Sequence, residues 1–142
     1  MVFEFRLKRR VMFYETDAAG IVHFSNYFRY MEEAEHALWR SAGLSISVPG
    51  AEIGWPRVNV SFEYARPLRF EEEFEVHLRI VEIGEKKIRY SCSVLSGGAS
   101  IATGTMTVVC VARRPNEPMK AVPIPKEIVS HFCVAPEGGQ AS

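Results

Sequence analysis

The sequence lacks several features, and each absence narrows the class of protein. It has no run of about 18 apolar residues, so we expect no transmembrane helix and no membrane partner. Its first ten residues, MVFEFRLKRR, contain no apolar core followed by a cleavage site, so we expect no secretory signal peptide. Lysine plus arginine equals aspartate plus glutamate at 17 each, and this balance argues against nucleic acid as the main partner.

Cysteine is scarce, and metal-ligand spacing is missing. The three cysteines, Cys92, Cys110 and Cys133, are odd in number and far apart, which argues against a disulfide framework. No cysteine pair has zinc-type spacing, and histidine, aspartate and glutamate form no ligand grouping, so we expect neither a metal nor another cofactor. The cysteines are then reduced packing residues, which is typical of a cytoplasmic protein.

What is present is the composition of an ordinary globular domain. The chain has 142 residues, of which 47% are apolar and 24% charged, enough to bury one core. No internal repeat or second domain is visible, so we predict a single domain over residues 1–134. Residues 135–142 are small and polar, which predicts a disordered tail.

Two periodicities organise the chain. Apolar residues at spacings of three and four predict one long helix from Asn26 to Ala42, with Ser25 or Asn26 as N-cap and Gly43 as the stop. Period-two alternation predicts strands over residues 3–14, 58–64, 74–80, 88–94 and 100–113.

The connecting segments complete this pattern. Gly97-Gly98 is typical of a hairpin turn, and segment 108–111 is apolar on both faces, which predicts a central strand. Residues 43–56 predict a loop, and a proline-rich arm leads to a short helix from Pro125 to Phe132. Strand, helix and four more strands predict an α+β fold, an antiparallel sheet on one helix whose edges pair with another subunit.

One stretch is similar to a known family. Residues 15–34, ETDAAGIVHFSNYFRYMEEA, resemble the signature of the hot-dog-fold acyl-CoA thioesterases in the 4-hydroxybenzoyl-CoA thioesterase group. Segments 60–76 and 108–125 are also similar to that family. The residues in register with the signature are Asp17, Gly20, Ile21, Val22, Asn26 and Tyr27.

The resemblance implies a hot-dog fold, with an antiparallel sheet of five or six strands wrapped around one helix. It implies hydrolysis of an acyl-CoA thioester by a homodimer or homotetramer whose active sites lie at the subunit interface. Asp17 would be the catalytic carboxylate, acting as nucleophile or general base. The backbone N–H of Phe24 would donate to the thioester carbonyl. The alternative is a structural role, in which Asp17 only caps a turn.

Other residues of the loop are further candidates for the site. His23 is a candidate catalytic residue or an ordinary packing residue of the loop, and a related branch of the family has its catalytic histidine one position later, where this chain has Phe24. Gly20 is expected to allow a positive φ or a close approach of substrate. Glu15, which stands where the family usually has aspartate, and Asn26 would order the loop beside the substrate.

Basic pairs near two strand ends are candidates for binding the phosphates of coenzyme A. They are Lys86 with Lys87 and Arg113 with Arg114, and each could instead lie in a solvated turn. The acyl group stays open between aromatic and medium-chain aliphatic. Two other functions also stay open: an acyl-CoA or acyl-carrier-protein binding module without turnover, and a hot-dog enoyl-CoA hydratase.

Overall fold

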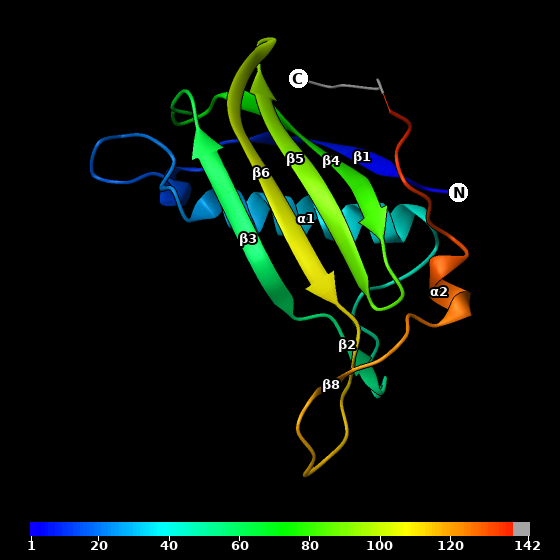
Figure 1. Cartoon of the computed structure of the whole chain (residues 1–142). Coiled ribbons are helices and arrows are strands. Elements are labelled where there is room, and N and C mark those ends of the chain that lie inside the picture. Colours follow the sequence, from blue (N-terminus) through cyan, green and yellow to red (C-terminus); the bar gives the residue numbers. More distant parts are fainter. Residues whose placement is uncertain (138–142) are drawn as a thin grey trace.

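A five-stranded antiparallel sheet covers one long helix in the computed structural model of the chain, which describes residues 1–137 (Figure 1). The strand order is β1-β4-β5-β6-β3, which places β1 and β3 at the two edges. The strands are β1 (Glu4–Arg10), β3 (Arg57–Tyr64), β4 (Glu73–Ile83), β5 (Lys87–Ser96) and β6 (Ala99–Val109). The predicted α+β arrangement is confirmed.

The inner face of the sheet forms the core because its alternation is strict. In β4 and β5 every second side chain is buried, and these residues are Phe74, Val76, Leu78, Ile80, Ile88, Tyr90, Cys92 and Val94. They pack against the buried stripe of α1 (Asn26–Ser41), which includes Tyr30, Met31, Ala34 and Leu38. Burial of each large apolar side chain contributes about 1.5–3 kcal/mol, so sheet and helix hold each other in place.

The helix begins and ends close to the predicted residues. Ser25 is the N-cap, although its side chain makes no capping hydrogen bond. At the other end Gly43 has φ 79, and its N–H donates to the Arg40 carbonyl at 2.9 Å. The N–H of Leu44 donates to the Trp39 carbonyl at 3.0 Å, which completes a Schellman motif. Gly43 is thus confirmed as the stop.

The first strand is shorter than predicted. It ends at Arg10 rather than Tyr14, and a 3-10 helix, η1 (Phe13–Glu15), follows. The reason is a local cap, because the Glu15 carboxylate accepts hydrogen bonds from the Met12 N–H at 2.9 Å and from Arg9 at 2.8 Å. These bonds turn the chain away from the sheet.

The last predicted strand is broken at Cys110. Its N–H donates to the Lys86 carbonyl at 2.7 Å and its carbonyl accepts from the Val122 N–H at 2.9 Å, outside the register of β6. The chain then forms β7 (Val111–Ala112), which lies between β2 (Ile53–Gly54) and β8 (Lys120–Ala121) in a small second sheet. The prediction of a continuous strand over 100–113 is therefore wrong, and the predicted loop over 43–56 is confirmed except for β2. The predicted central position of segment 108–111 is confirmed, since β6 lies between β5 and β3 and β7 lies between β2 and β8.

The C-terminal segment returns to the core. Helix α2 (Lys126–Val129) has Pro125 as its N-cap and is shorter than the predicted helix, which extended to Phe132. The buried Phe132 ring lies 5.1 Å from that of Trp39, centroid to centroid. Ala135, the first residue of the predicted tail, donates its N–H to the Ile80 carbonyl at 2.8 Å. The Pro136 carbonyl accepts from the Arg79 side chain at 3.2 Å, and residues 138–142 of that tail lie outside the described residues.

The three cysteines are free thiols. Cys92 and Cys110 are buried and Cys133 is half-buried. Burial raises the pKa of Cys92 to about 12 and also raises that of Cys110. Within residues 1–137 no helix has the length and apolar character needed to cross a membrane.

Candidate active site

The loop between η1 and α1 places Asp17 at a tight turn. The turn is closed by hydrogen bonds from the Asp17 N–H to the Ile21 carbonyl at 2.8 Å and from the Gly20 N–H to the Asp17 carbonyl at 3.0 Å. Gly20 has φ 81, as predicted, and a Cβ built there would meet no atom within 4 Å. Gly20 is needed for its backbone conformation and not to make room.

The two oxygens of the Asp17 carboxylate differ in their contacts. Oδ1 accepts the Ala19 N–H at 2.8 Å and, more weakly, the Ile21 N–H at 3.4 Å. Oδ2 has no hydrogen-bond partner among the described residues. Asp17, the only aspartate of the sequence, thus caps a turn with one oxygen and leaves the other free. The hydrogen bonds that cap the turn therefore leave one carboxylate oxygen of Asp17 available to a substrate.

The backbone N–H of Phe24 is also free. In the part of the chain that the structure describes, it donates to no protein group, whereas the other N–H groups from Ile21 to Phe28 each have an acceptor. His23 N–H donates to the Glu15 carbonyl at 2.9 Å, and Asn26 N–H donates to the His23 carbonyl at 2.9 Å. Phe24 lies just before α1, so its N–H shares the positive end of the helix dipole.

Asp17 and Phe24 line the same pocket, whose volume is about 480 Å³. Its other lining residues come from the loop, the start of α1 and the end of β3, and they are Ile21, Val22, Tyr27, Tyr64, Ala65, Arg66 and Pro67. Tyr64 and Arg66 were not predicted as site residues. Their only local signal was their place at the end of a strand just before Pro67, which does not reveal which loop they face.

The opposite side of the loop forms a polar framework. Glu15 is only 5% exposed, and its two carboxylate oxygens accept from Met12 and Arg9. The Asn26 side chain donates to the Glu15 carbonyl at 2.8 Å, so its predicted bracing role is confirmed. Both side chains are occupied in holding the loop.

His23 lies on this framework side and not in the Asp17 pocket. It lines a separate hollow of about 560 Å³ together with Glu15 and Asn26. Its Nδ1 is 2.8 Å from the Ser25 hydroxyl, and its ring stacks on that of Phe24 with centroids 4.5 Å apart. Within one chain the structure therefore separates His23 from Asp17.

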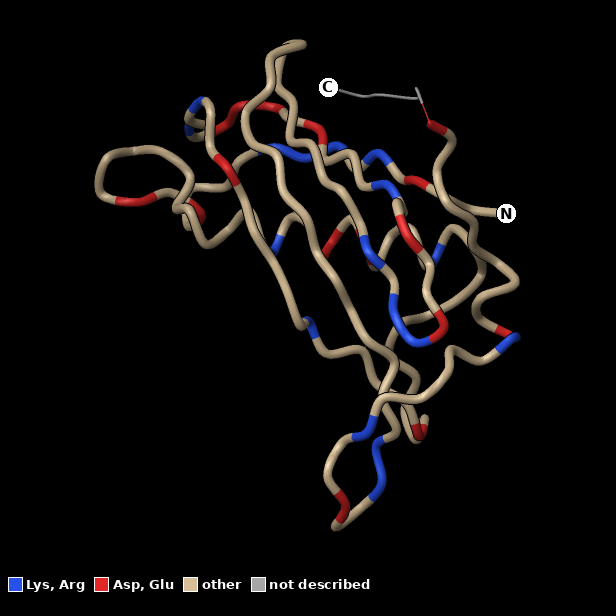
Figure 2. Tube along the Cα trace, in the orientation of Figure 1, with Lys and Arg blue, Asp and Glu red and all other residues tan. Residues whose placement is uncertain are grey.

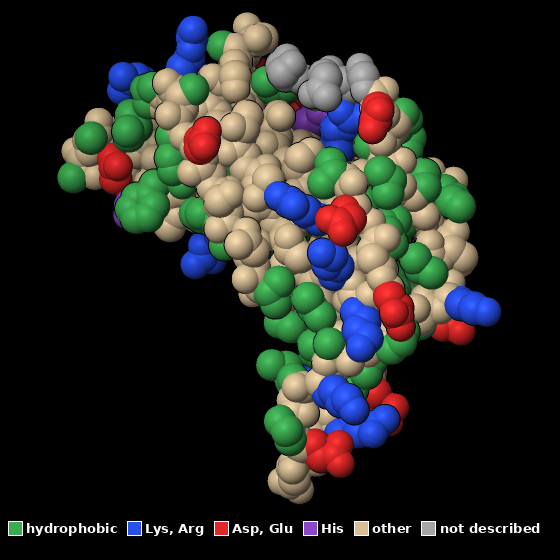
Figure 3. Space-filling model, in the orientation of Figure 1, with side chains coloured by type: hydrophobic (Ala, Val, Ile, Leu, Met, Phe, Trp, Pro, Cys, Tyr) green, Lys and Arg blue, Asp and Glu red, His purple; other side chains and the backbone are tan. Residues whose placement is uncertain are grey.

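The predicted phosphate-binding cations lie elsewhere. The β4–β5 turn carries Lys86 and Lys87, and the segment after β7 carries Arg113 and Arg114. Both segments lie at the end of the molecule opposite the loop before α1, where basic side chains gather (Figures 2 and 3). None of the four lines the Asp17 pocket, and Lys87 pairs with Glu82 at 3.3 Å. Arg66 is the cation that does line it.

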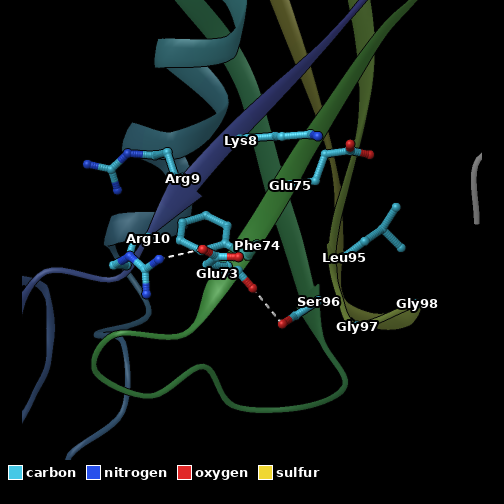
Figure 4. Close-up of a pocket in the computed structure, with 10 residues that line it drawn as sticks. All are labelled: Lys8, Arg9, Arg10, Glu73, Phe74, Glu75, Leu95, Ser96, Gly97 and Gly98. Carbon is cyan, nitrogen blue, oxygen red and sulfur yellow. Dashed lines mark hydrogen bonds and ion pairs between the residues drawn. The ribbon is translucent and has the colours of Figure 1, made fainter.

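A larger hollow of about 600 Å³ lies between the end of β1, the start of β4 and the β5–β6 hairpin (Figure 4). Two of its charged side chains, Arg10 and Glu73, form an ion pair. The Ser96 hydroxyl donates to the Glu73 carbonyl at 2.7 Å. In residues 1–137 no group of three or more histidine, cysteine, aspartate or glutamate side chains is placed to hold a metal ion.

An antiparallel sheet around one long helix matches the structures of hot-dog-fold thioesterases. A family model for the thioesterase-like superfamily matches residues 11–132, and the chain belongs to this superfamily. The predicted hot-dog fold and enzyme class, a hydrolase of thioesters, are thereby confirmed.

Individual relatives cover nearly the whole chain. A crystal structure of a hypothetical protein from Aquifex aeolicus is 38% identical with a TM-score of 0.82, over 89% of this chain and 98% of that chain. The acyl-CoA thioester hydrolase YbgC of Escherichia coli is 26% identical over 132 residues, covering 90% of this chain and 95% of YbgC. The structure of BH1999 gentisyl-coenzyme A thioesterase is 28% identical with a TM-score of 0.80, over 90% of this chain and 99% of that chain.

Proposed function

We propose that this thioesterase hydrolyses an acyl-CoA thioester to a free acid and coenzyme A, using Asp17 as nucleophile or general base and the Phe24 N–H as oxyanion donor. One observation carries the proposal. Two polar groups with no partner in the described chain, Asp17 Oδ2 and the Phe24 N–H, belong to residues that line one pocket. A carboxylate oxygen and an N–H that are both free for hydrogen bonding at one pocket can act together on a bound thioester carbonyl.

Two routes fit this arrangement. In one, Asp17 accepts a proton from water as the water oxygen attacks the thioester carbonyl. In the other, Asp17 Oδ2 attacks directly, the thiolate leaves, and water hydrolyses the mixed anhydride to regenerate the carboxylate. In both routes the carbonyl oxygen becomes negative and accepts the Phe24 N–H, a contact typically contributing about 2.7–4 kcal/mol. The departing coenzyme A thiolate takes up a proton from solvent, because a free thiol has a pKa of about 8.5.

The pocket walls favour an aromatic acyl group. Tyr27 is buried in the wall, and the Tyr64 ring lies edge-on to it with centroids 5.1 Å apart. Aromatic edges and faces of this kind pack well against a flat ring. Arg66 gives the pocket a positive charge, which suits an anionic coenzyme A ester.

The edge strand β3 supports association of two copies. Its outer edge is unpaired within residues 1–137, and Val58 and Val60 are 58% and 43% exposed. Exposed apolar edges commonly pair with a second strand, so we propose a homodimer joined along β3, or a homotetramer built from two such dimers. The pocket at the end of β3 would then lie at the subunit interface, and Lys86, Lys87, Arg113 or Arg114 of either subunit would meet the coenzyme A phosphates.

We place this activity in the cytoplasm. The support is that Cys92, Cys110 and Cys133 are all free thiols, which fits a reducing compartment.

The test is release of free thiol from aromatic and aliphatic acyl-CoA esters by the purified protein. We expect hydrolysis that is fastest with an aroyl-CoA and that is lost in Asp17→Asn. Glu117→Gln, at an exposed carboxylate in the arm after β7, is the matched control and keeps full activity. Tight binding of every ester without thiol release would favour the binding module, and hydration of an enoyl-CoA double bond would favour the hydratase.

A further inference from the structure

We infer that Tyr64 is a positioning residue, whose hydroxyl fixes the turn that presents the Phe24 N–H; this inference rests on the proposed function. The Tyr64 hydroxyl donates to the Phe24 carbonyl at 3.0 Å. The two residues are 40 positions apart in the sequence, so this bond ties the end of β3 to the start of α1. No other side chain of the described residues bonds to the Phe24 backbone.

The bond acts on the carbonyl of the residue whose N–H is free. The Phe24 N–H has no acceptor among the described residues, so the peptide group joining residues 23 and 24 is held directly only through the His23 carbonyl. On one side the His23 N–H donates to the Glu15 carbonyl at 2.9 Å, and the carbonyl of that peptide group accepts from Asn26. On the other side the Phe24 carbonyl accepts from Tyr64 at 3.0 Å and, weakly, from the Tyr27 N–H at 3.4 Å. Tyr64 thus supplies the stronger of the two contacts on that side.

The Tyr64 ring is itself held in place. It lies edge-on to Tyr27 at 5.1 Å and stacks on Phe62 at 6.1 Å, measured between centroids. Phe62 is in turn packed over Gly104, where a Cβ would come within 2.8 Å of the Phe62 ring. A ring fixed by such packing directs its hydroxyl without further loss of side-chain entropy.

The hydroxyl is a donor at neutral pH. Partial burial raises the pKa of Tyr64 above its ordinary value of 10.0, so the proton stays on the oxygen. An oxyanion donor must be pre-organised to stabilise developing charge without a cost of reorientation. Fixing the Phe24 turn contributes to that pre-organisation.

The test is Tyr64→Phe, which removes only the hydroxyl and keeps the ring. We expect kcat for the best acyl-CoA ester to fall about tenfold, less than the 10²–10³ typical of losing a direct donor, with KM within about twofold of wild type. The melting temperature should change little. In the NMR spectrum, amide hydrogen exchange should become faster at Asn26, whose N–H bond closes the same turn.

The matched control is Ser61→Ala, which removes a side-chain hydroxyl on the same strand, 3.0 Å from the Thr105 hydroxyl, but no hydrogen bond to Phe24. It should change the melting temperature as little as Tyr64→Phe does and change kcat by less than about threefold. Equal losses of kcat in the two variants would assign the effect to a general disturbance of β3 and overturn the inference, as would full kcat in Tyr64→Phe. A wild-type protein that releases no thiol from any ester would instead overturn the proposed function.

Discussion

The two sides of the loop between η1 and α1 differ in whether their polar groups have hydrogen-bond partners. On the framework side, the Glu15 carboxylate has a partner for each oxygen and Asn26 donates to the Glu15 carbonyl. On the pocket side, Asp17 Oδ2 and the Phe24 N–H have no partner among the described residues. The two sides share a short stretch of chain but differ in whether hydrogen bonding is complete.

The difference separates structural residues from reactive ones. A buried carboxylate with a cation on one oxygen and a backbone donor on the other stabilises the loop. A carboxylate with one free oxygen keeps its geometry through the bonded oxygen and its chemistry through the free one. Sequence spacing alone does not make this distinction, because Glu15 and Asp17 are two residues apart.

The largest expected effect comes from comparing the two sides directly. Asp17→Asn should lower kcat about a thousandfold, in the range of a lost general base, with little change in melting temperature because the amide oxygen still accepts from Ala19. His23→Ala should lower kcat by no more than about tenfold, since His23 lies in the separate hollow. Steady-state thiol release and thermal unfolding measure both. A larger loss of kcat in His23→Ala would indicate that the reaction takes place on the framework side.

The second prediction concerns the framework. Glu15→Gln breaks the ion pair with Arg9, whose side chains are 6% and 16% exposed, and should reduce the free energy of unfolding by about 3 kcal/mol. Glu75→Gln breaks the more exposed pair with Arg6 and should cost less than about 1 kcal/mol. Urea denaturation measures both values. Equal costs would mean that the framework side does not hold the loop.

A third prediction extends the comparison to a carboxylate in the core. Glu35 is fully buried beside Arg57, and burial raises the pKa of its carboxyl from 4.5 to about 7, because desolvation outweighs the Arg57 charge. Between these values the folded chain holds a proton that the unfolded chain releases, so stability falls as pH rises from about 4.5 to 7 and is level above.

Glu35→Gln should flatten this dependence, which amounts to at most about 3 kcal/mol across the window. Denaturation in urea at pH 5, 6 and 7 measures the slope for both proteins. An unchanged slope in the variant would assign the pH dependence to other groups.

The smallest expected effect tests the turn under Asp17. Gly20→Ala places a side chain at φ 81 and should cost about 1 kcal/mol, while a Cβ there meets nothing within 4 Å. Gly50→Ala, at φ 80 and equally unobstructed in the loop before β2, is the matched control with the same cost. Only Gly20→Ala should also lower kcat. If both variants keep full kcat, the turn geometry does not set the position of Asp17.

The sequence predicts what periodicity and local turns determine. The structure confirms the strands predicted from the alternation over 74–80 and 88–94, and it confirms Gly43 as the stop of the helix. Each of these signals lies within the element that it describes. The break at Cys110 escaped prediction, because β2, β7 and β8 are two residues each and are held only by one another. The early end of β1 depends on the Arg9–Glu15 pair, which alternation does not reveal.

The site residues also divide into those that a local sequence signal predicts and those that depend on distant contacts. Asp17, Gly20 and Phe24 were predicted through a contiguous signature, and the structure places Asp17 and Phe24 in one pocket. Tyr64 and Arg66 were missed because they reach that pocket only when β3 pairs with β6 at the far edge of the sheet. The role of the distant cations depends on a second subunit, which no pattern within one chain specifies.

The buried cysteine thiols react little with the coenzyme A that the enzyme releases. Thiol exchange and oxidation proceed through the thiolate, and with a pKa of about 12 Cys92 forms almost none at neutral pH. Cys110 is fully buried, which leaves only the half-buried Cys133 within reach of reagents. An enzyme that releases coenzyme A as a free thiol therefore has little tendency to form mixed disulfides with it through its core. For the same reason, thiol-reactive dyes added to a native reaction mixture will report turnover over a small protein background.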